Sequence, residues 1–167
     1  MQAWAPYYGT IGAAAATLLG LLFVAVSVNA SAALGSGDRL TRGMTEQAFQ
    51  NYLTVMMVAL LALFPRLEVA TFGLVCFVAV AARAVWVAVR IFQSLGHRGP
   101  RQSLTFELRR HFASVVGFGL LLVAAARMAM RWGEDFNMLA ASALVIMFSA
   151  TTVSWELLRR IANPTEE

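Results

Sequence analysis

The sequence has no lysine, one cysteine and few charged residues, and each shortage excludes a class of protein. Only 13% of the 167 residues are charged, against 59% that are hydrophobic, which lies outside the range of soluble globular domains. The single Cys76 excludes a disulfide framework within the chain. Without lysine the chain cannot hold retinal as a Schiff base, and arginine alone supplies its basic charge. We therefore predict an integral membrane protein without a separate soluble domain.

Motifs for catalysis and for cofactor binding are also missing. The sequence contains no nucleophile elbow, zinc-protease motif, phosphate-binding loop or dinucleotide fingerprint. Neither His97 nor His111 has an acid or thiol at ligand spacing, which argues against a zinc or haem site. The net charge of +4 comes from arginines beside the apolar runs. This placement fits loops that contact anionic lipid better than it fits a surface that binds nucleic acid. We predict a non-enzymatic protein with no cofactor, no metal site and no nucleic-acid partner.

Long apolar runs are what the sequence does contain. The first, residues 8–33, holds no charge and is long enough, at about 1.5 Å per residue, to cross a hydrocarbon layer of about 30 Å. Gly12, Ala16 and Gly20 recur at every fourth position, and small residues at this spacing let two helices approach closely in lipid. We predict a helix-packing face here, with chance in an alanine-rich helix as the alternative. No basic residue precedes the run, so we expect a retained span and not a cleaved signal peptide.

Four more apolar runs follow, and they predict an all-α transmembrane bundle of five spans in a single domain over residues 1–167. The spans are expected at residues 8–33, 45–64, 69–92, 111–130 and 137–158. The second is expected to begin with Thr45 as N-cap and to stop at Pro65.

The arginines predict the orientation of this bundle. Nine would fall on one side (Arg39, Arg42, Arg90, Arg98, Arg101, Arg109, Arg110, Arg159 and Arg160) and three on the other (Arg66, Arg127 and Arg131). By the positive-inside rule the N-terminus lies outside and the C-terminus in the cytoplasm. Within the arginine-rich side, Arg98, Arg101, Arg109 and Arg110 are expected to contact anionic lipid headgroups, with a partner protein as second choice.

Polar residues inside the apolar runs are the candidate site. Arg83 would lie within the third span and Glu156 near the cytoplasmic end of the fifth. An unpaired charge in a span costs at least about 2.5 kcal/mol. One hypothesis pairs Arg83 with Glu156 in the bundle interior; the alternative, slightly favoured, has Arg83 reaching the headgroups and Glu156 at the interface. Further polar residues would serve as contacts between helices or as the wall of an ion path: Ser27, Asn29, Asn51, Ser142, Ser149 and Thr152.

Residues 12–29, GAAAATLLGLLFVAVSVN, resemble the first span of a bacterial family of small polytopic membrane proteins. Its members open with an aromatic-rich N-terminus, and their second span ends in Leu-x-Pro or a similar sequence, as Leu63, Phe64 and Pro65 do here. Their last span ends in Trp followed by Leu and an acid, which Trp155, Glu156 and Leu157 match in altered order. The resemblance covers the first, second and fifth spans. It implies a multi-pass architecture in the bacterial inner membrane, and it implies no activity.

Three kinds of function remain. A homo-oligomeric channel for an ion or small solute, lined by the polar faces of the first, second and fifth spans, narrowly leads. The alternative is a helper or scaffold subunit that binds a larger membrane complex through the face of Gly12, Ala16 and Gly20. A lipid-modifying enzyme is weakest, because no acid–base or metal cluster is present. The expected partners are membrane lipids and either further copies of the chain or another membrane protein.

Overall fold

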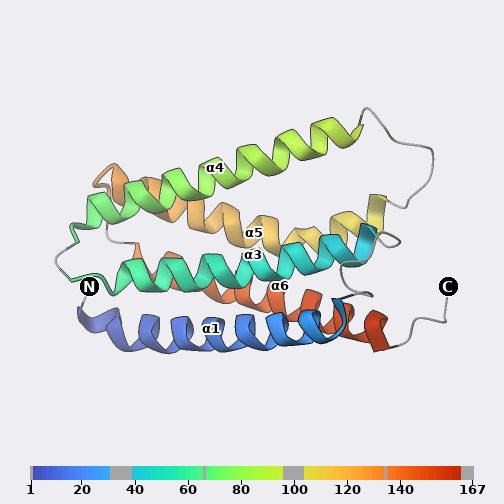
Figure 1. Cartoon of the computed structure of the whole chain (residues 1–167). Coiled ribbons are helices and arrows are strands. Elements are labelled where there is room, and N and C mark those ends of the chain that lie inside the picture. Colours follow the sequence, from blue (N-terminus) through green and yellow to red (C-terminus); the bar gives the residue numbers. More distant parts are fainter. Residues whose placement is uncertain (1, 31–38, 66, 96–103, 134, 163–167) are drawn as a thin grey trace. The chain divides into compact units, whose positions relative to one another are not determined.

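The chain is helical throughout the part that the structure, a computed structural model, describes. These residues are 2–30, 39–65, 67–95, 104–133 and 135–162, with side chains except at 2, 39–40, 86–95, 104–111 and 162. A short 3-10 turn, η1 (Gln2–Trp4), precedes helices α1 (Ala5–Val28), α3 (Arg39–Ala62), α4 (Val69–Leu95), α5 (Leu104–Ala129) and α6 (Phe136–Ala162) (Figure 1). The described residues contain no strand. The predicted all-α fold is confirmed.

Among the described residues, three helical segments are long and apolar enough to cross a membrane. They are Ala5–Val28, Phe112–Ala129 and Phe136–Ile161, and Val69–Val85 is a shorter apolar helix. Helix α3 differs because its N-terminal part and centre carry polar residues, among them Glu46, Gln47 and Asn51. The membrane class therefore rests on three helices, whereas five spans and their orientation stay predictions.

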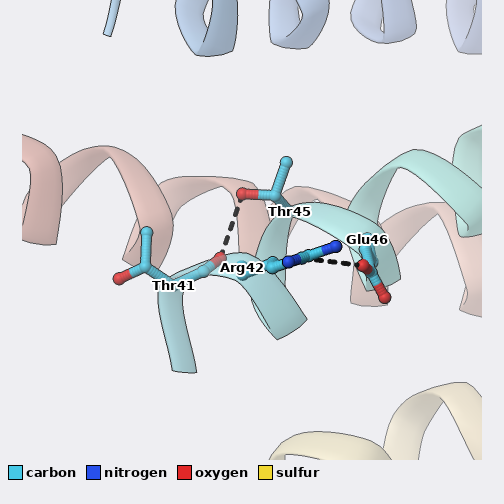
Figure 2. A network of polar contacts seen from close by, with 4 residues as sticks. All are labelled: Thr41, Arg42, Thr45 and Glu46. Atoms are coloured by element: carbon cyan, nitrogen blue, oxygen red, sulfur yellow. Dashed lines mark hydrogen bonds and ion pairs between the residues drawn. The ribbon is translucent and has the colours of Figure 1, made fainter. Parts of the chain in front are cut away.

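Helices α3 and α1 have ends that differ from those that the sequence predicted. Helix α3 begins at Arg39, so Thr45 lies inside it and is not an N-cap. The Thr45 hydroxyl donates to the Thr41 carbonyl oxygen at 3.0 Å, one helical turn back, beside the ion pair of Arg42 with Glu46 (Figure 2).

Helix α1 ends at Val28, inside the predicted span of residues 8–33. Asn29 leaves the helical conformation (φ −113°, ψ 36°), and its side-chain amide donates to the Ala25 carbonyl oxygen at 3.0 Å. Local hydrogen bonding of this kind competes with helix continuation. Residues 31–33 lie outside the described part of the chain.

The chain divides into two compact units, and the single domain stays a prediction. Unit 1 consists of Met1–Phe64 and Ala143–Glu167. Its helices α1 and α3 lie side by side (Figure 1) and run antiparallel, since Gly12 approaches Ala59 while Leu22 joins Met44 in one core cluster. The C-terminal part of α6 completes that cluster, whose buried members are Leu22, Met44, Ala48, Tyr52, Ala150, Val153 and Leu157.

Unit 2, Pro65–Ser142, is built on the packing of α4 against α5. Gly73 lies at a close approach of the two helices. A Cβ atom at this position would lie 2.6 Å from the Ala129 backbone nitrogen and 2.8 Å from the Ala125 carbonyl oxygen. Phe72 stacks on Phe136 nearby, with ring centroids 6.4 Å apart. The absence of a side chain at position 73 is thus what permits the close contact of the helices.

Candidate functional site

Polar side chains in unit 1 connect helices within the unit. The Tyr52 hydroxyl lies 3.1 Å from the Thr151 hydroxyl, which joins α3 to α6. Because Thr151 donates its own proton to the Met147 carbonyl oxygen at 2.9 Å, Tyr52 is the donor in this contact. Its aromatic ring is fully buried in the core cluster. The pair therefore places a satisfied hydrogen bond at the edge of an apolar core.

The residues predicted to line a pathway do not share one environment. Asn51 and Ser149, in unit 1, are buried. Ser142, in unit 2, is buried as well, and its hydroxyl donates to the Leu139 carbonyl oxygen at 2.7 Å. Ser27 and Thr152 are exposed. Hydroxyls that bond to their own helix in this way satisfy themselves and leave fewer groups to coordinate a passing solute.

The predicted helix-packing face of α1 divides into an inner and an outer part. A Cβ atom at Gly12 would lie 2.9 Å from the Ala59 Cβ atom, so Gly12 packs against α3 inside unit 1. Ala16 and Gly20 are exposed, and no atom lies within 4 Å of a Cβ atom built at Gly20. Of the three residues at four-residue spacing, Gly12 thus packs within the chain. Ala16 and Gly20, one and two turns later, leave a flat exposed surface.

Arg83 has an aromatic partner within its own unit. Its guanidinium carbon lies 4.6 Å from the centre of the Phe118 ring, so α4 and α5 are joined by a cation–π contact. Such a contact stabilises by about 0.5–1 kcal/mol at an exposed site and by about 2 kcal/mol when it is desolvated. Phe118 is a partner that sequence reasoning missed, because an isolated aromatic residue in an apolar run carries no recognisable signal.

Glu156 likewise has partners on its own helix. Its carboxylate oxygens lie 3.5 Å from both the Arg159 and the Arg160 guanidinium groups. Arg83 and Glu156 belong to different units, and their pairing stays a prediction. The arginine neighbours of Glu156 and the aromatic neighbour of Arg83 favour the alternative hypothesis. In that hypothesis the two charges do not pair, and each is stabilised by its own local partners.

A double-mutant cycle separates the two hypotheses. We expect Arg83→Met and Phe118→Leu to be non-additive by about 1 kcal/mol, the size of a partly buried cation–π contact. Arg83→Met and Glu156→Gln should be additive within about 0.5 kcal/mol if the charges do not meet. The free energy of unfolding in mixed micelles is the measurement. Coupling above about 1 kcal/mol in the second cycle would restore the Arg83–Glu156 pair.

Two ion pairs connect the ends of helices in unit 2. Arg131 contacts Glu68 at 2.6 Å, and Arg127 pairs with Asp135. Arg131 has a left-handed backbone (φ 58°) at the end of α5, where the amide of Trp132 donates to the Arg127 carbonyl oxygen as in a Schellman cap. The Glu68–Arg131 pair was missed from the sequence, since 63 positions separate its members.

The remaining predicted residues lie outside the part of the chain whose side chains are described. They are Arg98, Arg101, Arg109 and Arg110, together with His97 and His111, so lipid contact by the four arginines stays a prediction. Among the described residues, no group of three His, Cys, Asp or Glu side chains is arranged to hold a metal ion.

The candidate site therefore consists of an exposed small-residue surface on α1 and of polar contacts that hold each unit together. Neither arrangement assembles a nucleophile with a base. The predicted likeness to a bacterial family of small polytopic proteins rests on the sequence alone. Comparison with protein-family models, with curated proteins and with solved structures finds no match for this chain.

Proposed function

We propose that this chain is a non-enzymatic, five-span protein of the bacterial inner membrane that works as a helper or scaffold subunit. In this proposal it binds another membrane helix through the outer surface of α1. The exposed, open position of Gly20 carries the proposal. Ala16 precedes it by one turn and the large apolar side chains of Leu21 and Val24 flank it, all exposed. A flat strip between such side chains lets a second helix pack closely in lipid, where dispersion contacts and not the hydrophobic effect drive association.

Burial of polar side chains favours this function over the channel that leads from sequence alone. Asn51 and Ser149, which a conduit would present to its solute, are buried. The exposed hydroxyl of Thr17 donates to a carbonyl oxygen of its own helix. A conduit requires polar groups that face water, whereas these groups face protein or their own backbone.

Five spans with the N-terminus outside remain the best topology for the proposal. Helix α3 can cross the membrane with a polar N-terminal part because Thr45 and Asn51 are buried, and polar groups in a bilayer are tolerated where protein covers them. The exposed Arg42 and Glu46 pair with each other at 3.3 Å, and charges in a span are tolerated where they pair. Helix α4 has 27 residues, about 40 Å at 1.5 Å per residue. Trp4 and Tyr7 at the start of α1 form an edge-to-face pair of the kind found at headgroup level.

A homo-oligomeric channel is the second candidate, and the exposure of Ser27 favours it. Copies joined through α1 would bring their Ser27 side chains, which lie on the open side of the helix, towards a common axis. The oligomer would then supply the conduit that a single chain of this size lacks.

The substitution Gly20→Leu tests the interaction surface. We expect it to weaken association about tenfold or more, because a large side chain on a flat strip separates the helices. The fold should be retained, since the position is open. The measurement is the composition and mass of the particle in lipid discs, with Gly119→Leu as the control at another open glycine of an apolar helix.

Three results are distinguishable. A membrane-protein partner that is lost in Gly20→Leu and kept in Gly119→Leu supports the helper function. A closed homo-oligomer of three or more chains that follows the same pattern supports the channel instead. A lone monomer for all three proteins contradicts both.

A further inference from the structure

One face of α6 in unit 1 exposes an ordered series of side chains. Leu144, Phe148, Thr152, Trp155 and Arg159, here called the α6 stripe, are all exposed, and their spacings of three and four place them on one side of the helix. The opposite side is buried, with Ile146, Ala150, Val153 and Leu157 in the interior. The stripe is thus the surface that α6 turns away from the core of the unit.

The side chains of the α6 stripe change along the helix from apolar to aromatic to cationic. Phe148 is 67% exposed, Trp155 71%, and the Arg159 side chain 67%. From Leu144 to Arg159 the helix rises about 22 Å at 1.5 Å per residue, close to half of a bilayer of about 40–45 Å including its headgroups. Tryptophan sits at headgroup level in membrane proteins, with apolar side chains deeper. The sequence of side chains therefore matches the depth profile of one leaflet.

The polar end of the stripe carries a net positive charge. Glu156 is shared by Arg159 and Arg160, each at 3.5 Å, so one carboxylate faces two guanidinium groups. Arg160 is the more buried of the two and Arg159 the more exposed. On α3, Arg42 pairs with Glu46 at 3.3 Å. Arg159 is thus the more exposed of two guanidinium groups that share one carboxylate, and its remaining N–H donors suit phosphate oxygens.

We propose that the α6 stripe binds an anionic phospholipid. Arg159 contacts the phosphate, Trp155 the glycerol and carbonyl region, and Phe148 with Leu144 the acyl chain. This inference rests on the proposed function in one respect, that α6 spans the membrane. Positive charge at the end of an exposed stripe argues for lipid as the occupant and not a second apolar helix, because an anionic headgroup supplies the charge complement at that depth.

Fluorescence quenching by brominated lipids tests the proposal on the full-length protein in liposomes. The chain has four tryptophans, so the Trp155 signal is obtained as the difference between the wild type and Trp155→Phe. Quenching by dibrominated phosphatidylglycerol is compared with quenching by dibrominated phosphatidylcholine at equal mole fractions. We expect the Trp155 signal to report about a fivefold preference for the anionic lipid, the effect of one arginine near an anionic surface.

Charge variants make the test specific. Arg159→Gln should abolish the preference, whereas Arg42→Gln, at an exposed arginine on α3 and outside the α6 stripe, should retain it. Equal quenching by the two lipids, or a preference that survives Arg159→Gln, would overturn the lipid site while leaving α6 in the membrane. No quenching of Trp155 by either lipid would overturn both the site and the spanning of α6.

Discussion

Gly73→Val is expected to destabilise unit 2 by about 3 kcal/mol or more, as overpacking against backbone atoms does. The cause is the contact of α4 with α5. The Cβ atom alone would lie 2.6 Å from the Ala129 nitrogen, 2.7 Å from the Met128 Cβ atom and 2.8 Å from the Ala125 carbonyl oxygen. Backbone atoms of a helix cannot rotate away as a long side chain can, so the two helices must separate and lose their packing.

The matched control is Gly119→Val on α5, where no atom lies within 4 Å of the added Cβ atom. Both substitutions place the same side chain in a helix, so their intrinsic propensity terms cancel. Unfolding by a denaturing detergent, followed by circular dichroism, gives the difference in free energy. Equal stability of the two variants would mean that α4 and α5 do not approach each other at Gly73.

Leu157→Ala is expected to destabilise unit 1 by about 2 kcal/mol or more, the lower end for a large-to-small change in a core. Leu157 is fully buried in the cluster that joins α1, α3 and α6, and Met44 and Val153 belong to the same cluster. Removing its isobutyl group leaves a cavity and forfeits dispersion contacts.

The neighbouring Leu158→Ala provides the control, because Leu158 is 41% exposed. We expect it to change stability by less than about 0.5 kcal/mol, as surface substitutions do. The same detergent titration compares the two, since both remove identical atoms from adjacent positions of one helix. A larger loss for Leu158→Ala than for Leu157→Ala would reverse the orientation of α6 in unit 1.

Helices and their apolar length were predictable because both depend on local sequence. The run from Ala5 to Val28 is apolar on every side, and such a helix is stable only where lipid or protein surrounds it. Helix α3 was predicted too short, since Arg39 and Arg42 look like part of a polar loop when read one by one. The i,i+4 pair of Arg42 with Glu46 instead supports a helix that continues through them.

Contacts across helices were not predictable, because they depend on which faces meet. Gly12 and Gly20 follow the same four-residue rule, yet one contacts Ala59 and the other is open. Pairing of Arg83 with Glu156 was one of two hypotheses from the sequence and stays a prediction. Within their own units Arg83 contacts the ring of Phe118, and Glu156 contacts two arginines of its own helix. Opposite charge indicates compatibility, but proximity depends on packing.

The sequence by itself determined the class of this protein: an all-helical chain with helices able to cross a membrane. Apolar runs of sufficient length leave no other way to satisfy the backbone in lipid. Only the tertiary structure decided which residues serve the interior and which serve the surface. In the structure Gly73 lies in a close contact between helices, Gly20 lies on an open surface of α1, and Trp155 and Arg159 are both exposed. The physical reason is that a side chain is buried only when another helix packs against it. The order of residues along the chain does not show which helix faces meet.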